Sequence, residues 1–308
     1  MAGGVTLAVA IPQTFASGSV DTRMIRDFLR RAEALGFESA WVVEHILGAM
    51  PSLEPVELLA YAAAVTERLR LGAAVLLTAL RDPIHVAKSL ATLDQLSHGR
   101  LVAGVGLGGV PRVYPAFGLS AARRAARFAE GVRVMKRLWT EPRVTVDGEF
   151  FRLDAVAVEP KPVQRPHPPL VFGGHHPQAL RRAVELGDGF IGAGAASTAA
   201  FADEMRTLRA LLAEAGRAPE TFPVGKRVYL ALDRDRARAG KRLAEWFGAF
   251  YGRPALAEEV AVWGDADACV EGLRAVRAAG AGFLLLNPVF DELEQLERLA
   301  ADVAPRLA

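Results

Sequence analysis

The stretch RLRLGAAVLLTALRDPIHVAKSLATLDQLSHGRLVAGVG, residues 68–106, contains one complete strand–helix–strand unit. Residues 69–77 are almost all apolar, as in a strand whose two faces are both buried. Asp82 and Pro83 then begin a helix, because Asp is a favourable N-cap and Pro fits the first helical position. A second apolar strand follows at 100–106. Two buried strands joined by a helix predict a parallel sheet covered by helices.

The same alternation extends over the whole chain and predicts eight strand–helix pairs. Eight repeats fit a closed (β/α)8 barrel, the TIM barrel of the α/β class, better than an open doubly wound sheet. We expect one domain over residues 1–308, because a single barrel of this kind reaches such a length. The strands are expected at 5–11, 39–43, 69–77, 100–106, 169–173, 189–194, 224–232 and 282–287.

Two stretches interrupt this alternation and are predicted to be insertions. Residues 143–168 resemble a hairpin that turns at Asp147-Gly148 and continues into a proline-rich connector. Residues 251–264 form an extra segment before the last repeat. We interpret both as additions to a single barrel rather than as linkers between domains.

The charge balance argues against a nucleic-acid or membrane partner, because 37 basic and 35 acidic residues leave a net charge of +2. The densest basic stretch, 123–137, has apolar residues at helical spacing, and we interpret it as a solvated helix face rather than an acid-binding patch. No run approaches the ~18 apolar residues that a membrane span needs. The N-terminal segment lacks the basic start of a signal peptide, so a cytoplasmic protein is expected.

The cysteine and histidine content predicts no metal site and no disulfide. The single cysteine, Cys269, lies in a helical pattern, where a small packed residue is the expected role. The six histidines lack the spacing of the familiar zinc motifs.

Catalytic groups in a parallel barrel stand at the carboxyl ends of the strands. The strand at 39–43 ends at Glu44 and His45. An imidazole at this place can act as a general acid or base near neutral pH. The alternative is a histidine at a strand end that a neighbouring group satisfies.

The glycine-rich sequence GVGLGG, residues 104–109, follows another strand. A dinucleotide-binding fingerprint requires a helix directly after such glycines, and Val110-Pro111 interrupts it. The glycines, Gly106 and Gly108 among them, are expected to let a ligand approach the backbone closely, or to form a simple turn.

A second such sequence, GGHHP at residues 173–177, joins a strand to a helix whose first position is Pro177. Free backbone amides at a helix start bind anions, so a phosphate site is expected here. His175 and His176 have two other interpretations, as plain loop residues or as metal ligands.

Four segments together resemble the luciferase-like monooxygenase family, and they occur in the right order over nearly the whole chain. The resemblance implies a (β/α)8 barrel that binds FMN or the deazaflavin coenzyme F-420 at its carboxyl end. Family members with FMN use reduced flavin and oxygen, whereas members with the deazaflavin pass hydride between the cofactor and an alcohol, aldehyde or activated alkene. The segments are GFESAWVVEH (36–45), the stretch 68–106 quoted above, EPKPVQRPHPPLVFGG (159–174) and LGDGFIGAG (186–194).

The resemblance also implies roles for individual residues. His45 matches a histidine that faces the isoalloxazine ring, and Glu44 matches an acidic position before it. Ala74-Val75 matches a non-proline cis peptide that supports the back of the ring. Phosphate contacts are implied for Gly173, Gly174, His175, His176 and Gly194, with the neighbouring DGFI (188–191) on the same side.

Two positions depart from the family pattern. Sugar-phosphate dehydrogenases of the deazaflavin branch carry a catalytic glutamate where this chain has Gly109. The arginine that holds FMN phosphate in bacterial luciferase would fall near Leu107. A mechanism that uses either group is therefore not expected here.

The sequence and the resemblance thus predict an oxidoreductase that transfers hydride between reduced coenzyme F-420 and a small organic substrate, and the residues leave two alternatives open. These alternatives are an FMN-dependent monooxygenase and a non-catalytic flavin-binding protein. A homodimer is expected.

Overall fold

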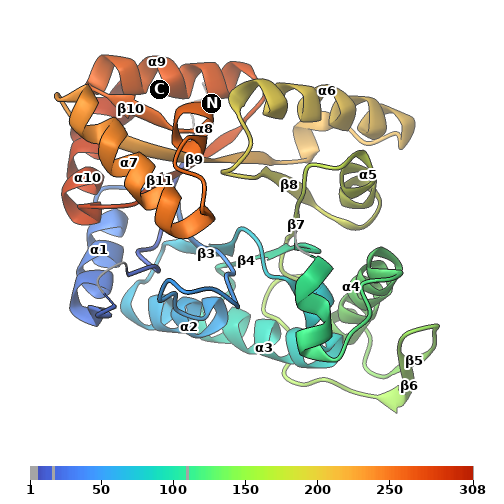
Figure 1. Ribbon diagram of the computed structural model, residues 1–308. Helices are drawn as coiled ribbons and strands as arrows, with labels where there is room; N and C mark the ends of the chain where they lie inside the picture. The colour runs from blue at the N-terminus through green and yellow to red at the C-terminus, as the bar shows by residue number, and fades with distance from the viewer. Residues whose placement is uncertain (1–5, 16–17, 109–110, 308) are drawn as a thin grey trace.

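The computed structural model describes residues 6–15, 18–108 and 111–307. Within them, eight parallel strands pair in a closed ring, because β9 pairs with both β8 and β11 (Figure 1). The predicted (β/α)8 barrel is therefore confirmed. In ring order the strands are β1 (Thr6–Ala10), β2 (Ser39–Val42), β3 (Arg70–Ala73), β4 (Leu101–Val105), β7 (Leu170–Gly173), β8 (Gly189–Gly192), β9 (Val224–Leu232) and β11 (Phe283–Pro288).

Helices connect these strands and surround the barrel (Figure 1). Local sequence marks where several of them begin. Asp21, Asp82 and Asp235 each accept hydrogen bonds from amides of the following first turn, which satisfies groups that a helix start leaves unpaired. The helices are α1 (Thr22–Ala34), α2 (Pro55–Val65), α3 (Pro83–Leu96), α4 (Arg124–Thr140), α5 (Pro177–Leu186), α6 (Thr198–Glu214), α7 (Arg236–Tyr251), α9 (Ala266–Ala278) and α10 (Glu292–Arg298).

Strand β3 is shorter than the predicted 69–77, because the chain bulges after Ala73. The peptide bond between Ala74 and Val75 is cis, as the family resemblance implied. Gly72 pairs with Val102, but Leu76 pairs with Val105, so β3 contains one residue more than β4 between these pairings. A short 3-10 helix, η1 (Thr78–Leu80), follows the bulge.

Both predicted insertions are present as additional elements. The first is an antiparallel hairpin of β5 (Val144–Asp147) and β6 (Arg152–Val156), followed by a connector with cis Pro160 and cis Pro166. The second contains α8 (Leu256–Val260) and β10 (Val262–Gly264), and β10 pairs in parallel with the last residues of β9.

Apolar side chains fill the inside of the barrel, so the barrel is a packed core and a ligand has to bind at one end of it. Trp41 and Phe283 stack inside it with 5.6 Å between their ring centroids. Cys269 is buried, as predicted. No helix in the described part of the chain is both long enough and apolar enough to cross a membrane. The interior cluster consists of Ala8, Ala10, Trp41, Val102, Val171, Ile191 and Leu285.

Candidate active site

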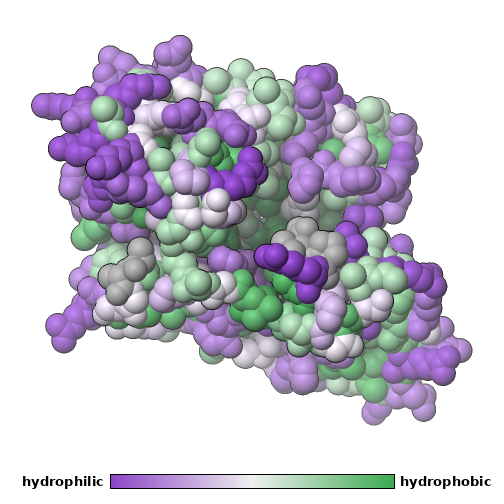
Figure 2. Space-filling view, viewed as in Figure 1, coloured by the Kyte–Doolittle hydropathy of each residue, from purple (hydrophilic) through white to green (hydrophobic). Residues whose placement is uncertain are grey.

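The carboxyl ends of the barrel strands border two hollows at the mouth of the barrel, and Figure 2 shows this face recessed in the middle. The large hollow contains about 1930 Å³ of non-protein space, part of it open to solvent. It lies over the ends of β3, β4, β7 and β8 and beside the first turns of α4 and α5. The small hollow contains about 420 Å³ of non-protein space, also partly open to solvent, and lies over the ends of β1, β2 and β11 and beside α7.

Val75, at the β3 bulge, forms part of the floor of the large hollow. A Cβ on Gly106 would lie 2.6 Å from Val75 Cγ2, and a Cβ on Gly173 would lie 2.9 Å from Val75 Cγ1. A Cβ on Gly104 would lie 1.6 Å from the carbonyl oxygen of Ala73. The glycines of β4 and β7 therefore make room for the bulge and for its valine. The sequence predicted that a ligand approaches these glycines closely. It did not predict that the protein's own residues, Ala73 and Val75, also fill the space beside them.

The large hollow brings together the residues predicted to bind the cofactor, with the exception of Glu44. Those that line it are Ala74, Val75, Gly106, Gly108, Gly173, Gly174, His175, His176 and Gly194. Gly109 lies outside the described residues. Asp188, at the start of the implied segment 188–191, lies at the opposite end of β8, where its carboxylate accepts from the amide of Leu170 at 2.8 Å. The expectation that this whole segment borders the phosphate is therefore wrong for Asp188.

Glu44 has its partners inside the protein. Its side chain is fully buried and accepts from the amide of Leu77 at 2.5 Å and from Nη2 of Arg81 at 2.7 Å. Arg81 also pairs with Glu54. Because Leu77 lines the large hollow, Glu44 fixes the backbone that follows the bulge.

His45 is half-buried at the end of β2 and lies outside the residues that line either hollow. Its ring lies 4.7 Å from that of Phe250, which borders the small hollow. Its Nδ1 is buried and has no hydrogen-bond partner among the described residues. The interpretation of His45 as a strand-end histidine satisfied by a neighbour therefore has no support from a hydrogen bond at this atom.

The start of α5 differs from the expected anion site. Pro177 has no N–H, the amide of Gln178 donates to Nδ1 of His176 at 3.1 Å, and that of Ala179 donates to the His176 carbonyl at 2.7 Å. His176 therefore caps the helix. The first turn does not supply the free amides that the sequence suggested, so an anion here needs other donors.

Two arginines at the rim of the large hollow can supply them. Arg124, at the start of α4, and Arg182, in α5, both line the hollow. Among the described residues, neither has a carboxylate within ion-pair distance. Burial lowers the pKa of Arg182 from its ordinary value, Glu185 opposes this shift, and Arg124 adds to it. Two cations that repel each other across a hollow favour an anion between them.

Arg124 was missed because its basic stretch was interpreted as a solvated helix face. That interpretation is wrong for Arg124, which turns toward the hollow at the first position of α4. It holds for Arg137, which pairs with Glu141 at 2.7 Å on the half-exposed surface. The sequence contained one usable signal, since Arg124 stands near the end of the chain segment that follows the β4 glycines.

Arg227 and the aromatic residues of α7 were also missed. Arg227 lies in β9 and lines both hollows, and Trp246 and Phe250 line the small one. The two adjacent cations Lys226 and Arg227 inside an otherwise apolar strand were a signal that could have been used, although it does not say which of them enters the hollows. No group of three or more histidine, cysteine, aspartate or glutamate side chains suited to a metal ion occurs in the part of the chain that the structure describes.

The family model for the luciferase-like monooxygenases matches residues 1–257. The chain belongs to the luciferase-like monooxygenase family. An uncharacterized protein of Mycobacterium tuberculosis is 44% identical over 124 residues, 40% of this chain and 44% of that one. The chain thus spans less than half the length of the first curated relatives it matches. An F420-dependent glucose-6-phosphate dehydrogenase of Kineococcus radiotolerans is 32% identical over 236 residues, 72% of this chain and 68% of that protein.

Solved structures of this family share the barrel. An F420-dependent secondary alcohol dehydrogenase, in complex with an F420-acetone adduct, superposes with a TM-score of 0.86 at 21% identity, covering 99% of both chains. A monooxygenase from Streptomyces bottropensis superposes with a TM-score of 0.85 at 25% identity, covering 98% of this chain and 100% of that one. These likenesses agree with the barrel described above.

Proposed function

We propose that this luciferase-like protein is an oxidoreductase that transfers hydride between reduced coenzyme F-420 and a small organic substrate. The observation that carries the proposal is the large hollow, with the Val75 bulge as its floor and the unpaired Arg124 and Arg182 at its rim. The choice of deazaflavin follows the relatives that are about one third identical, which are named F420-dependent glucose-6-phosphate dehydrogenases.

The residues present fit such a cofactor. Val75, Leu77 and Ile191 offer an apolar surface for a tricyclic ring, and the volume of the large hollow leaves room for such a ring. The two arginines, with the backbone of Gly174 and His175, would hold the ribityl phosphate. When bound, the deazaflavin supplies the hydride, and the protein supplies orientation and exclusion of water.

His45 is the group we assign to proton transfer at the substrate oxygen. Its unpartnered Nδ1 and its ring contact with Phe250, which lines the small hollow, support this role. Glu44 is a positioning residue, since its carboxylate holds Leu77 rather than facing the hollow. Because Gly109 stands where sugar-phosphate dehydrogenases have a glutamate, we do not extend the substrate of the curated relatives to this chain.

An FMN-dependent monooxygenase is the second candidate, favoured by the 25% identical monooxygenase that shares the fold over 98% of this chain. FMN has a tricyclic ring and a ribityl phosphate too, so the same hollow suits it. The third candidate is a flavin-binding protein without catalysis. The small hollow, whose residue Phe250 contacts His45, argues against it, because a protein that only binds flavin needs no second site. A single domain over residues 1–308, a homodimer and a cytoplasmic location belong to the same proposal.

Titration of the purified full-length protein with coenzyme F-420 and with FMN, followed by fluorescence, tests the proposal. We expect F-420 to bind in the micromolar range and FMN to bind more weakly. Failure of both cofactors to bind at tens of micromolar would remove the proposal. Tighter binding of FMN, with oxygen consumption, would replace it with the second candidate.

A further inference from the structure

Arg227 occupies the wall between the two hollows. It lies in β9, with Gly194 of the large hollow on one side and Asn287 of the small hollow on the other. A Cβ on Gly194 would lie 3.3 Å from Cγ and Cδ of Arg227, so the two segments are in close contact. Any group bound in either hollow near this wall meets the same guanidinium.

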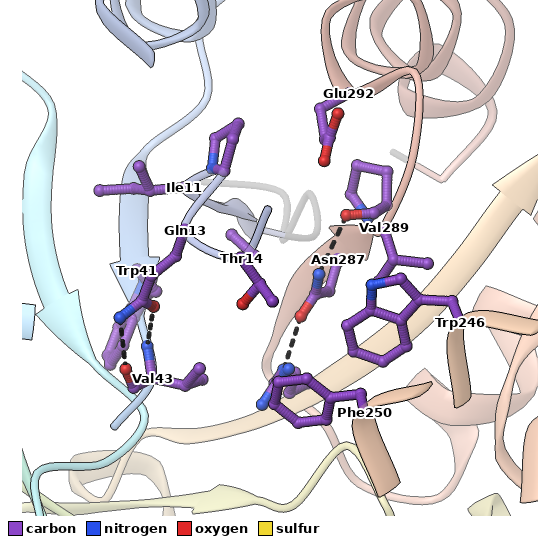
Figure 3. Close-up of a pocket in the computed structure, with 14 residues that line it drawn as sticks. Ile11, Gln13, Thr14, Trp41, Val43, Trp246, Phe250, Asn287, Val289 and Glu292 are labelled. Atoms are coloured by element: carbon purple, nitrogen blue, oxygen red, sulfur yellow. Dashed lines mark hydrogen bonds between the residues drawn. The ribbon is translucent and has the colours of Figure 1, made fainter. Parts of the chain in front are cut away.

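Neutral oxygens hold this guanidinium in place. Its Nε donates to Oδ1 of Asn287 at 2.7 Å, and its Nη2 donates to the hydroxyl of Tyr229 (Figure 3 shows the Asn287 contact). The amide nitrogen of Asn287 donates to the Pro288 carbonyl at 3.0 Å, which fixes the orientation of the amide with its oxygen toward Arg227. The Tyr229 hydroxyl also lies 2.7 Å from that of Tyr251. These bonds hold the guanidinium in one orientation, and its Nη1 has no hydrogen bond among the described residues.

No negative charge balances Arg227 within the part of the chain that the structure describes, since no carboxylate lies within ion-pair distance. Burial raises the pKa of Tyr229 well above its ordinary value, so the phenol beside Arg227 stays neutral. A half-buried cation without a counter-charge is costly, and an anionic ligand that pairs with it recovers that cost.

Glu292 is the carboxylic acid that lines the small hollow, and its side chain points into it (Figure 3). Burial raises the pKa of this carboxyl, and the neighbouring Asp291 raises it further, while a hydrogen bond from its own backbone amide and the charge of Arg242 oppose the shift. Among the described residues, its carboxylate forms no ion pair. Glu292 is thus a carboxyl with a raised pKa in the same hollow, and Arg227 is the cation that lines it.

Most of the other residues that line the small hollow are apolar, and its polar side chains, Gln13, Thr14 and Asn287, already have hydrogen-bond partners. Trp246 and Phe250 stack on each other with 4.7 Å between ring centroids and an angle of 12° between planes. Ile11 faces them across the space, and Val289 lies beside Trp246 (Figure 3). An aromatic and aliphatic lining around one fixed cation suits a ligand with an apolar body and a single anionic group.

We propose that the small hollow is the substrate site and that it selects a small carboxylate with a planar apolar body, whose carboxylate pairs with Arg227 while the body packs on Trp246 and Phe250. This proposal rests on the proposed function in one respect, because only an oxidoreductase would use the bound carboxylate as a substrate. In this proposal Arg227 makes the site prefer an anionic substrate over a neutral one.

The test compares ligands that differ in charge alone. Benzoate and benzamide are titrated into the full-length protein, with and without F-420, and tryptophan fluorescence reports binding. We expect benzoate to bind at least ten times more tightly than benzamide, a preference that Arg227→Gln abolishes and Arg227→Lys partly retains. Trp246→Phe should remove most of the fluorescence change while calorimetry still detects binding. Arg206→Gln, which removes an exposed arginine of α6, is the matched control and should keep the preference.

The outcomes separate this inference from the proposed function. Equal binding of the two ligands to the wild-type protein overturns it. So does an Arg227→Gln variant that keeps the preference for benzoate but loses affinity for F-420, because Arg227 would then serve the cofactor. An Arg227-dependent preference in a protein that binds neither F-420 nor FMN leaves the inference standing and removes the proposed function. If Arg227→Gln fails to fold, as thermal melting would show, Asn287→Ala replaces it and should weaken the same preference, and a full preference in that variant counts against the proposal.

Discussion

The side chain of Val75 occupies the space that a Cβ on Gly106 would need, with only 2.6 Å between that position and Val75 Cγ2. We expect Gly106→Ala to lower the free energy of unfolding by about 1–3 kcal/mol, because the added methyl group overpacks the bulge. It should also weaken cofactor binding, since Val75 lies on the floor of the large hollow. Urea denaturation and cofactor titration measure the two effects.

The control for Gly106 is Gly131, in the middle of α4, where a Cβ would meet its nearest neighbour at an ordinary 3.5 Å. Gly131→Ala should be neutral or should stabilise the protein by up to about 1 kcal/mol. Shortening the valine gives a second check, because Val75→Ala combined with Gly106→Ala should cost less than the sum of the two changes. Strict additivity would contradict the contact.

The unpartnered Nδ1 of His45 leads to a prediction about turnover. If His45 moves a proton, His45→Ala should lower the turnover number by roughly 10²–10⁴-fold and leave cofactor affinity nearly unchanged. Steady-state kinetics and F-420 titration measure the two quantities. His85→Ala, on the exposed side of α3, is the control. Unchanged turnover in His45→Ala would give this histidine a structural role.

The arginine pair at the rim predicts how the protein recognises a phosphate. Arg124→Gln and Arg182→Gln should each weaken binding of the phosphorylated cofactor by about tenfold, the value of one charge-assisted hydrogen bond. Binding of riboflavin, which lacks the phosphate, should not change. Arg137→Gln, on the same helix as Arg124 but paired with Glu141, is the control. Equal losses for FMN and riboflavin would show that the arginines do not bind the phosphate.

Glu204 of α6 and Lys226 of β9 are two buried ionisable residues, and the Lys226 ammonium lies over the Phe201 ring of α6. Burial raises the pKa of Glu204 from 4.5 to about 7, against the attraction of Lys226. A carboxyl with a raised pKa contributes stability below its unfolded pKa and loses it as the pH rises through the folded one. Relative to Glu204→Gln, the wild-type protein should therefore lose up to about 3 kcal/mol between pH ~4.5 and ~7.

Lys226 supplies the matching test in another pH window. Burial lowers the pKa of its ammonium from 10.5 to about 7, so the folded state holds this proton less firmly than the unfolded state. Relative to Lys226→Met, the wild-type protein should gain stability as the pH rises from about 7 to about 10.5. Urea midpoints across both ranges measure the two trends. Parallel stability curves for wild type and variant would mean that neither group is perturbed.

The barrel was predictable because most of its strands are continuous apolar runs with clear ends. β9 has the predicted bounds, Val224–Leu232, because apolar residues dominate it, and α5 begins at the predicted Pro177, because a proline fits the first turn of a helix. The bulge after Ala73 follows no local pattern and was implied by the family resemblance alone.

The parts of the site that backbone atoms form could be predicted from the sequence. The parts that long side chains form could not. The glycine-rich strand ends lie at the mouth because all parallel strands end there. Lys226 and Arg227 are neighbours, yet alternation in a strand sends one toward α6 and the other into the mouth, and no local signal says which. Arg124 and Arg182 line the same hollow because their helices, α4 and α5, are adjacent in the barrel.

Strand β10 has a consequence for solubility during folding. Leu230 of β9 pairs with Pro288 of β11 and with Val262 of β10, so these two strands lie on opposite edges of β9. β8 pairs only with the first residues of β9, from Val224 to Lys226, and β10 covers the end that β8 leaves free. An uncovered strand edge is a template for association with another chain. The second insertion thus covers the last residues of this β9 edge, Leu230–Leu232, and keeps them from pairing with another chain.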